Sequence, residues 1–324
     1  MDQILINHSP LITDVENFVE DTIHDDRPWK DYWSKLVDIL QELQVQYNPD
    51  LLYSAYNQAM IKLMLELEQD LKAFQSIKDS TVKHLRFSDV KSGFEKFERK
   101  HKKEVQHFKA DELKNREKAI EYAELLLEHY SKLLVVRVDL SYRQEKRTFI
   151  DILDFRKDIR KLLDRLQDGD RHFKGLHGYI FALEQGFQKG YHAHFLLFYN
   201  GSQFKSDRHI ADCVIKTWKV ITNDMGIGYN SNTKENRDKY RKTGNDALGC
   251  FNRGDIAKKD KILNMVRYFA KPDKTEQRLL VRVKNMQSFG HGKFKKPSRR
   301  NLAETIERVR LNIQIESRKT YSRR

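Results

Sequence analysis

The first part of the chain has its apolar residues at the spacing of amphipathic helices. Through residues 12–130 they recur every three or four positions, as in WSKLVDILQEL (33–43). This period places them on one side of a helix, where they can pack into a core. A charge-rich continuation over 88–131 predicts one long helix, or two helices broken near Lys109. Residues 1–128 are therefore expected to form a helical domain.

The period then changes to two. In LVVRVDLSY (134–142) apolar and polar residues alternate from the third position on, which predicts a half-buried strand. A helical pattern follows over residues 147–167. Residues 178–184 and 192–199 then have the composition of two strands, and the glycine-containing turn between them predicts a hairpin.

Two more helices complete the predicted pattern. They span residues 207–221 and 259–271, and Pro272 ends the second. Residues 223–247 are rich in Gly, Asn, Lys and Arg and are predicted to form a loop, followed by a short strand at 248–252. The order of strand, helix, hairpin and helix is typical of an α+β domain, in which helices flank an antiparallel sheet.

Charge is distributed unevenly along the chain. The net charge is +14, but residues 1–50 contain 3 Lys/Arg against 11 Asp/Glu, so the basic excess lies in the remainder. Residues 289–324 contain 11 Lys/Arg and 3 Glu. Such an excess attracts a polyanion, and nucleic acid is the usual one. The acidic start is interpreted as a solvated helical face rather than as a partner surface.

The composition also indicates the cellular compartment in which the protein is expected. The sequence has no run of 18 or more apolar residues, which a membrane-spanning helix would need. Its start lacks the basic and apolar segments of a secretory signal. Cys213 and Cys250 are the only cysteines, and neither belongs to a paired metal-binding motif. We therefore expect a cytoplasmic protein, with no membrane contact and no disulfide.

The strongest candidate for chemistry is a pair of histidines in the second strand of the hairpin. His192 and His194 are two positions apart, so they share one face of the strand. Imidazoles arranged in this way can bind one divalent metal ion, which needs a third ligand. Glu184 ends the preceding strand and is the candidate, although its orientation depends on the strand register. The competing interpretation is two polar residues on a solvated sheet face.

Tyr268 lies away from the apolar stripe of its predicted helix. It falls beside Lys261, Asn264 and Lys271 at helical spacing. Ammonium groups near a tyrosine favour its phenolate and stabilise charge that develops on a phosphate, so this tyrosine is suited to attack a phosphate. The competing interpretation is an amphipathic packing residue at the edge of a helix.

Four segments resemble, in order and spacing, the replication protein family encoded by gene 2 of filamentous phages (inoviruses). This family includes the YagK/YfjJ C-terminal domain of enterobacterial prophages and falls within the HUH endonucleases. The segments are KGYHAHFLLFYNGS (189–202), TWKVITNDMGIGYNSN (217–232), MVRYFAKPDK (265–274) and FGHGKF (289–294). The resemblance covers about residues 130–297 and leaves 1–128 outside. It implies an HUH-type nicking domain with an RRM-like palm. The residues after it, 298–324, are themselves basic and have a helical pattern, which predicts a helical tail.

The resemblance also implies a role for each candidate residue. Tyr268 would attack the scissile phosphate and form a 5′-phosphotyrosine link, with Lys271 as its electrostatic helper. Tyr229 and Tyr240, in the predicted loop, are alternative nucleophiles. The ion would be Mg²⁺ or Mn²⁺, and it would polarise the phosphate. The implied metal ligands are His192, His194 and Glu184.

DNA is the implied partner, as a single-stranded or supercoiled origin, and a host replication helicase is a further candidate. We expect a sequence-specific nickase and strand transferase that initiates rolling-circle replication of a phage, prophage or other mobile element. The alternative is a non-catalytic DNA-binding regulator of prophage origin with the same fold. Basic and aromatic residues of the loop and tail would contact the DNA. They are Lys239, Tyr240, Arg241, Lys242, Lys293, Lys295, Lys296, Arg299 and Arg300.

Overall fold

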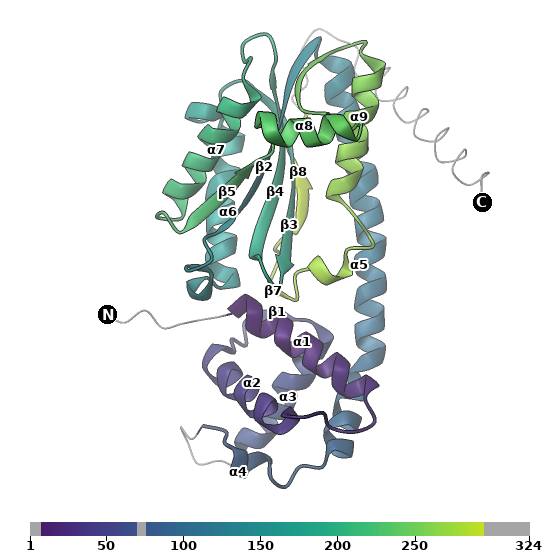
Figure 1. Ribbon diagram of the computed structural model, residues 1–324, viewed down its shortest axis with the longest axis vertical. Helices are drawn as coiled ribbons and strands as arrows, with labels where there is room; N and C mark the ends of the chain where they lie inside the picture. The colour runs from purple at the N-terminus through teal and green to yellow at the C-terminus, as the bar shows by residue number, and fades with distance from the viewer. Residues whose placement is uncertain (1–7, 70–75, 295–324) are drawn as a thin grey trace, which may run out of the picture.

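A computed structural model describes residues 8–69 and 76–294 of the chain (Figure 1). Within these ranges no helix has the length and apolar character needed to cross a membrane. The helices are α1 (His8–His24), α2 (Tyr32–Gln46), α3 (Ala55–Gln69), α4 (Asp79–Val82), α5 (Phe87–His129), α6 (Ile152–Asp168), α7 (Asp207–Ile221), α8 (Lys234–Lys242) and α9 (Ile256–Phe269), with short 3₁₀ turns η1 (Arg147–Phe149), η2 (Arg171–Phe173) and η3 (Thr275–Gln277). The strands are β1 (Leu51–Tyr53), β2 (Lys132–Tyr142), β3 (Leu176–Gly186), β4 (Gly190–Asn200), β5 (Gly226–Asn230), β6 (Gly249–Asn252), β7 (Val281–Val283) and β8 (Phe289–His291).

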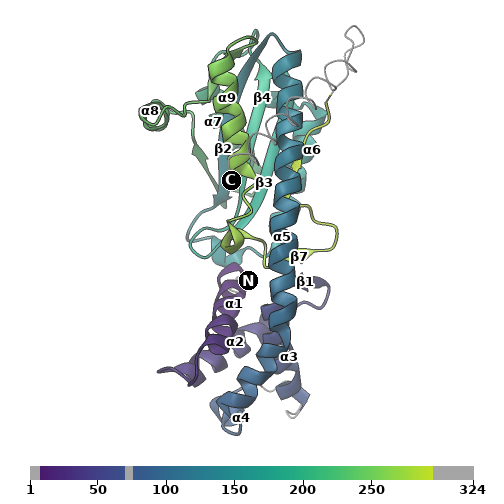
Figure 2. The same cartoon turned by 90° about the vertical axis from the view of Figure 1, so that its right-hand side faces the viewer.

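An antiparallel sheet of six strands forms the centre of the larger part of the molecule. Its order is β5-β2-β4-β3-β8, and β6 also pairs with β2. Helices α6 and α7 pack on one face, while α9 and the second half of α5 pack on the other (Figures 1 and 2). The predicted α+β fold, with an antiparallel sheet behind a helical N-terminal region, is confirmed.

Helix α5 connects the two parts of the molecule. It runs unbroken from Phe87 to His129, so the alternative with a break near Lys109 is wrong. Its first half packs against α1 and α3, and Figure 2 shows its second half continuing along the sheet. There Ala119 and Ala123 are fully buried, and their small side chains let the helix approach the sheet closely. The helix therefore belongs to the cores of both parts.

The prediction of a loop over residues 223–247 was wrong, because this segment contains β5 and α8. Strand β5 pairs with β2, and α8 begins at the N-cap Thr233, whose side chain accepts a hydrogen bond from the backbone N–H of Asn236. Helix α8 buries no residue, so it has no apolar stripe for the sequence to reveal. Arg237 anchors it through ion pairs with Asp246 at 2.9 Å and Asp207 at 3.1 Å.

Strand β1 was not predicted, because the N-terminal region was expected to be helical throughout. Leu51, Leu52 and Tyr53 pair with Val283, Arg282 and Val281 of β7. This two-stranded sheet joins the N-terminal helices to the segment that follows α9. Three residues are too few to show an alternating pattern, and the partner strand lies far along the chain.

Helix α1 is fixed against the rest of the molecule by buried polar contacts. Its Glu16 carboxylate pairs with Arg278, lies 3.5 Å from the His101 ring nitrogen and accepts a 2.9 Å hydrogen bond from Asn57. Burial raises the pKa of Glu16, but these contacts outweigh it and lower the pKa overall. One carboxylate thus ties α1 to α3, to α5 and to the chain before β7.

A second contact joins the start of α1 to the hairpin. His8 Nδ1 and the Tyr191 hydroxyl are hydrogen-bonded at 2.9 Å, and both side chains are buried. Burial lowers the pKa of His8 to about 4, although the Asp151 charge opposes the shift. The imidazole is therefore neutral in the folded protein at neutral pH, whereas in an unfolded chain it titrates near the ordinary value of 6.5.

We expect His8 to make the protein less stable as the pH falls from about 6.5 to about 4, because only the unfolded chain takes up this proton. A shift of this size corresponds to about 3 kcal/mol at the acid end. Urea unfolding of the wild type and of His8→Gln at pH 7.5, 5.5 and 4.5 measures it. The variant should lose less stability on acidification, and equal losses would contradict the assignment.

Candidate metal centre

Polar side chains gather at one end of the sheet face that α5 and α9 cover. The antiparallel register places Glu184 opposite His192, and Ala182 opposite His194. On β2, Asp139 lies opposite His194. Toward the other end of the same face the strands carry apolar core residues. They are Leu133, Val135, Ile180, Leu196 and Phe198.

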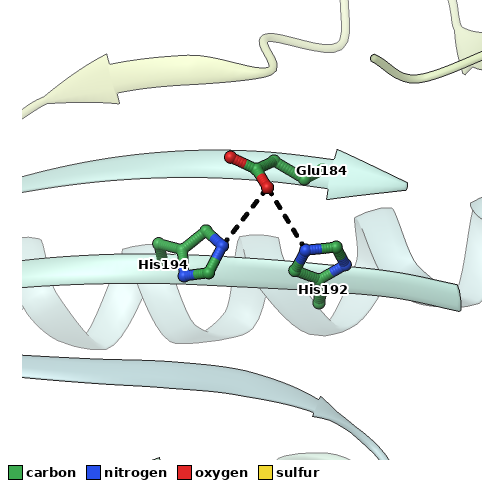
Figure 3. Close-up of side chains that lie close together, drawn as sticks. All are labelled: Glu184, His192 and His194. Carbon is green, nitrogen blue, oxygen red and sulfur yellow. Dashed lines mark ion pairs between the residues drawn. The ribbon is translucent and has the colours of Figure 1, made fainter. Parts of the chain in front are cut away.

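Glu184, His192 and His194 converge, as Figure 3 shows. Glu184 Oε2 lies 3.3 Å from Nε2 of His192 and 3.3 Å from Nε2 of His194. The three potential ligand atoms all lie within 4.8 Å of one another. Atoms bound to a single ion at about 2 Å lie up to about 4 Å apart, so small side-chain rotations would bring them into range. The register that the sequence left open therefore directs Glu184 toward both histidines.

The outer nitrogens of both rings have fixed partners. Nδ1 of His192 lies 3.0 Å from the Gly190 carbonyl oxygen, and Nδ1 of His194 lies 2.8 Å from Asp139 Oδ1. Because these oxygens only accept, both contacts suit a proton on Nδ1. A ring protonated there alone leaves its Nε2 lone pair for a metal ion. Metal-binding histidines are oriented in this way by outer carboxylates and carbonyls. The donor set fits a divalent ion.

Electrostatics around the three residues keep two carboxylates ionised. Burial raises the pKa of Asp139, but His194 and Arg137 outweigh it and lower the pKa to about 2. The pKa of Glu184 is likewise held well below its ordinary range, because contacts with the histidines outweigh burial. Burial lowers the pKa of His194, but the carboxylates Asp139 and Glu184 raise it overall. The Glu184 carboxylate therefore stays ionised beside both Nε2 atoms, and the Asp139 carboxylate stays ionised beside Nδ1 of His194.

Two basic residues that the sequence analysis did not assign to the site, Arg137 and Lys274, contact its carboxylates. Arg137 donates from Nε and Nη2 to the Asp139 carboxylate, both at 3.2 Å, and its guanidinium lies 5.4 Å from the Phe269 ring centroid. Lys274 Nζ lies 3.3 Å from Glu184 Oε1. Arg137 and Asp139 are the charged positions on one face of the first predicted strand. This pair of charges in an otherwise apolar strand could have identified both residues as site candidates, if the strand beside it had been known to carry the histidines.

Tyr268 lies close to this centre on the exposed side of α9. Its side chain is 49% exposed, whereas Phe269 beside it is buried and its ring centroid lies 6.3 Å from that of His194. The ammonium group of Lys271 lies 3.3 Å from the centroid of the Tyr268 ring, and that of Lys274 lies 5.4 Å from it. Lys274 therefore pairs with the Glu184 carboxylate and lies within cation–π range of the Tyr268 ring.

The two alternative nucleophiles, Tyr229 and Tyr240, have different surroundings from those of Tyr268. Tyr229 lies opposite Asp139 in the sheet, but its hydroxyl donates to Asn236 Oδ1 at 2.5 Å. Burial, with smaller effects from Tyr240 and Asp139, raises its pKa, which disfavours the phenolate. Tyr240 of α8 is partly buried against the core below α5 and α9. The structure thus brings all three tyrosines to the same region.

A cleft of about 880 Å³ lies in front of the histidines. Arg137, Asp139 and Glu184 line it together with His192 and His194. Its other walls come from α1, from the turn between β3 and β4, and from residues 274–278. The site is therefore open to a ligand of nucleotide size.

Of the expected DNA-binding residues that the structure describes, all but Tyr240 are exposed. Lys239, Lys242 and Lys293 are exposed, and so is Arg241, which also forms ion pairs with Asp238 at 2.7 Å and with Asp246 at 3.1 Å. Helix α8, which carries several of these residues, stands out from the body of the molecule in Figure 2. The tail residues Lys295, Lys296, Arg299 and Arg300, with the helix expected over 298–324, lie outside the described residues.

A comparison with protein families agrees with the resemblance carried by the motifs. The family model of the YagK/YfjJ C-terminal domain matches residues 95–292, more than half of the chain. The chain belongs to the YagK/YfjJ C-terminal domain family. No curated protein and no solved structure matches it.

The YagK/YfjJ domain begins inside α5, whereas the motifs alone covered only residues 130–297. The reason is structural, since the second half of α5 forms one wall of the sheet core through Ala119, Tyr122 and Leu126. The matched range contains every residue of the candidate metal centre, together with Tyr268 and Lys274. Helices α1 to α3 and strand β1 lie outside it.

We expect Asp139→Asn to weaken binding of Mn²⁺ by about 10- to 100-fold, because the amide orients His194 less firmly than the carboxylate does. Glu184→Gln and His192→Ala remove ligands and should weaken it further. Titration calorimetry with Mn²⁺ measures these affinities. Asp164→Asn, an exposed position on α6 across the sheet, is the matched control and should bind as the wild type does. Unchanged affinity in all variants would rule out this metal centre.

Proposed function

We propose that the chain is a metal-dependent DNA nickase and strand transferase that initiates rolling-circle replication of a phage, prophage or other mobile element. The observation that carries the proposal is the position of Lys274 between the Glu184 carboxylate and the Tyr268 ring. It associates a candidate nucleophile with the candidate metal ligands. A protein that only bound DNA would not need this combination.

The side chains have distinct roles in the proposed reaction. Glu184, His192 and His194 would hold a divalent ion, Mg²⁺ or Mn²⁺, which when bound polarises a phosphate oxygen. The Tyr268 hydroxyl oxygen forms a bond to phosphorus and loses its proton. The bond from phosphorus to the 3′ oxygen breaks, and that oxygen leaves as a protonated 3′-hydroxyl. The product is a 5′-phosphotyrosine, whose phosphodiester energy allows a later 3′-hydroxyl to rejoin the strand without ATP.

The lysines and Arg137 support the same step. The ammonium group of Lys271 lies over the Tyr268 ring, where it can stabilise charge that develops on a phosphate attacked by this tyrosine. Arg137 lines the cleft, and its Nη1 makes no hydrogen bond to any of the described residues, so it is available to a phosphate oxygen. Tyr268 is the preferred nucleophile because the Tyr229 hydroxyl is engaged and the Tyr240 side chain is partly buried.

The nickase is tested with purified protein, Mn²⁺ or Mg²⁺, and single-stranded DNA spanning the genetic neighbourhood of its own gene. Denaturing electrophoresis should show a covalent protein–DNA adduct that is absent in Tyr268→Phe. Tyr229→Phe and Tyr240→Phe are the matched controls and should still form it. An adduct that persists in Tyr268→Phe and is lost in Tyr240→Phe would instead assign the nucleophile to Tyr240 of α8. Tight binding without any adduct would favour a DNA-binding regulator.

Arg137→Gln should slow adduct formation by about 10²- to 10³-fold at saturating DNA, because one charged donor to the phosphate is lost. Arg137→Lys should recover part of the rate. Single-turnover rates measure the effect, and Mn²⁺ affinity is measured beside them, since Arg137 also contacts Asp139. A rate loss that tracks lost metal affinity would assign Arg137 to the metal centre alone.

A further inference from the structure

The cleft in front of the candidate metal centre has one wall that lies outside the family domain. Thr13, Asn17 and Glu20 of α1 line it, together with Phe187 and Lys189 of the turn between β3 and β4. The N-terminal helices therefore form part of the same space as the histidines. A helix that only supported the sheet would not need to present side chains to this cleft.

Phe187 is exposed although it is a large apolar residue. Its side chain is 57% exposed, at the tip of the hairpin whose strands carry Glu184 and His192. It lines the same cleft as these two residues. Exposed aromatic rings are a common stacking surface for unpaired bases, since every base has a π face.

Side chains of both charges line the cleft, including Lys274 and, two residues later, Glu276 of η3. Lys189 and Lys274 line the side of the hairpin and η3, next to the metal ligands, and suit a phosphodiester. Glu20 lies on the α1 wall and repels phosphate, but its carboxylate can accept hydrogen bonds from the exocyclic amino group of a base. The Asn17 amide beside it can donate and accept. A strand in the cleft would therefore direct its backbone to the lysines and its base to α1.

The two walls are held in a fixed relation. Gln185, two residues before Phe187, donates from Nε2 to the Ser9 carbonyl at 3.3 Å and accepts at Oε1 from the Leu280 backbone N–H at 3.0 Å. The hydrogen bond between His8 and Tyr191 fixes the same end of α1 to the following strand. A site whose opposite walls are joined in this way is preorganised for one ligand geometry.

We propose that this cleft binds one unpaired base of the substrate strand, stacked on Phe187 and contacted at its edge by Asn17 and Glu20. The preferred base carries an exocyclic amino group, as adenine and cytosine do. The proposal rests on the proposed function in that the ligand is single-stranded DNA. It assigns to the N-terminal helices a role in recognising the sequence beside the nick.

The test measures binding without cleavage, in EDTA and at one fixed salt concentration, because salt changes such affinities strongly. Fluorescein-labelled oligonucleotides dA15, dC15 and dT15, and an abasic backbone of equal length, are titrated with the full-length chain. Phe187→Ala should weaken binding of the base-bearing strands by about 5- to 150-fold and leave the affinity for the abasic strand unchanged. Phe187→Trp should retain binding.

Val220→Ala is the matched control, because Val220 is 66% exposed on α7, which covers the opposite face of the sheet. It should change none of the affinities. The double variant Asn17→Ala, Glu20→Ala should abolish a preference for dA15 or dC15 over dT15 that the wild type shows. Equal weakening of base-bearing and abasic strands by Phe187→Ala would overturn the proposal, as would a wild type that does not distinguish them. Base-dependent binding through Phe187 in a chain that forms no adduct would uphold this site while refuting the nickase.

Discussion

The register of the β3–β4 hairpin is the constraint on which the candidate site depends. Glu184 faces His192 across the ladder, and every second residue on each strand shares that face. A slip by one residue would direct the carboxylate and the imidazoles to opposite faces of the sheet. Tyr191, Phe195 and Leu197, now packed below α6 and α7, would then lose their core positions. The hydrophobic core thus enforces the register, and the register assembles the polar centre.

The same face carries a shared system of charges rather than three independent ligands. Asp139 is ionised beside both Arg137 and the outer nitrogen of His194, and Glu184 is ionised beside both histidines and Lys274. Removing one member therefore leaves a buried partner without its compensating charge, which costs more than the contact itself contributes. Such a cluster, half-enclosed at the edge of a cleft, is more readily explained by a bound ligand than by stability alone.

Much of this arrangement could be predicted from the sequence. The period-two pattern of β4 was enough to place His192 and His194 on one face, and the family motifs pointed to Tyr268 and Lys271. Predicting that Glu184 approaches the histidines required the register of the hairpin. Predicting the contact of Asp139 with His194 required the knowledge that β2 lies beside β4. Those facts come from long-range pairing, which local patterns do not contain. Helix α8 was missed because it buries nothing, and β1 was missed because three residues show no period.

The N-terminal helices also bear on the site through the segment that follows α9. This segment leaves the helix at Ala270 and carries Lys274 to Glu184, then pairs with β1 through β7. Arg278 between these points is held by Glu16 of α1. Anchors on both sides therefore fix the position of Lys274, although the strand that provides one of them lies outside the family domain. The family domain would need other contacts to hold this lysine if it occurred without such helices, so we regard the N-terminal region as part of the site's framework.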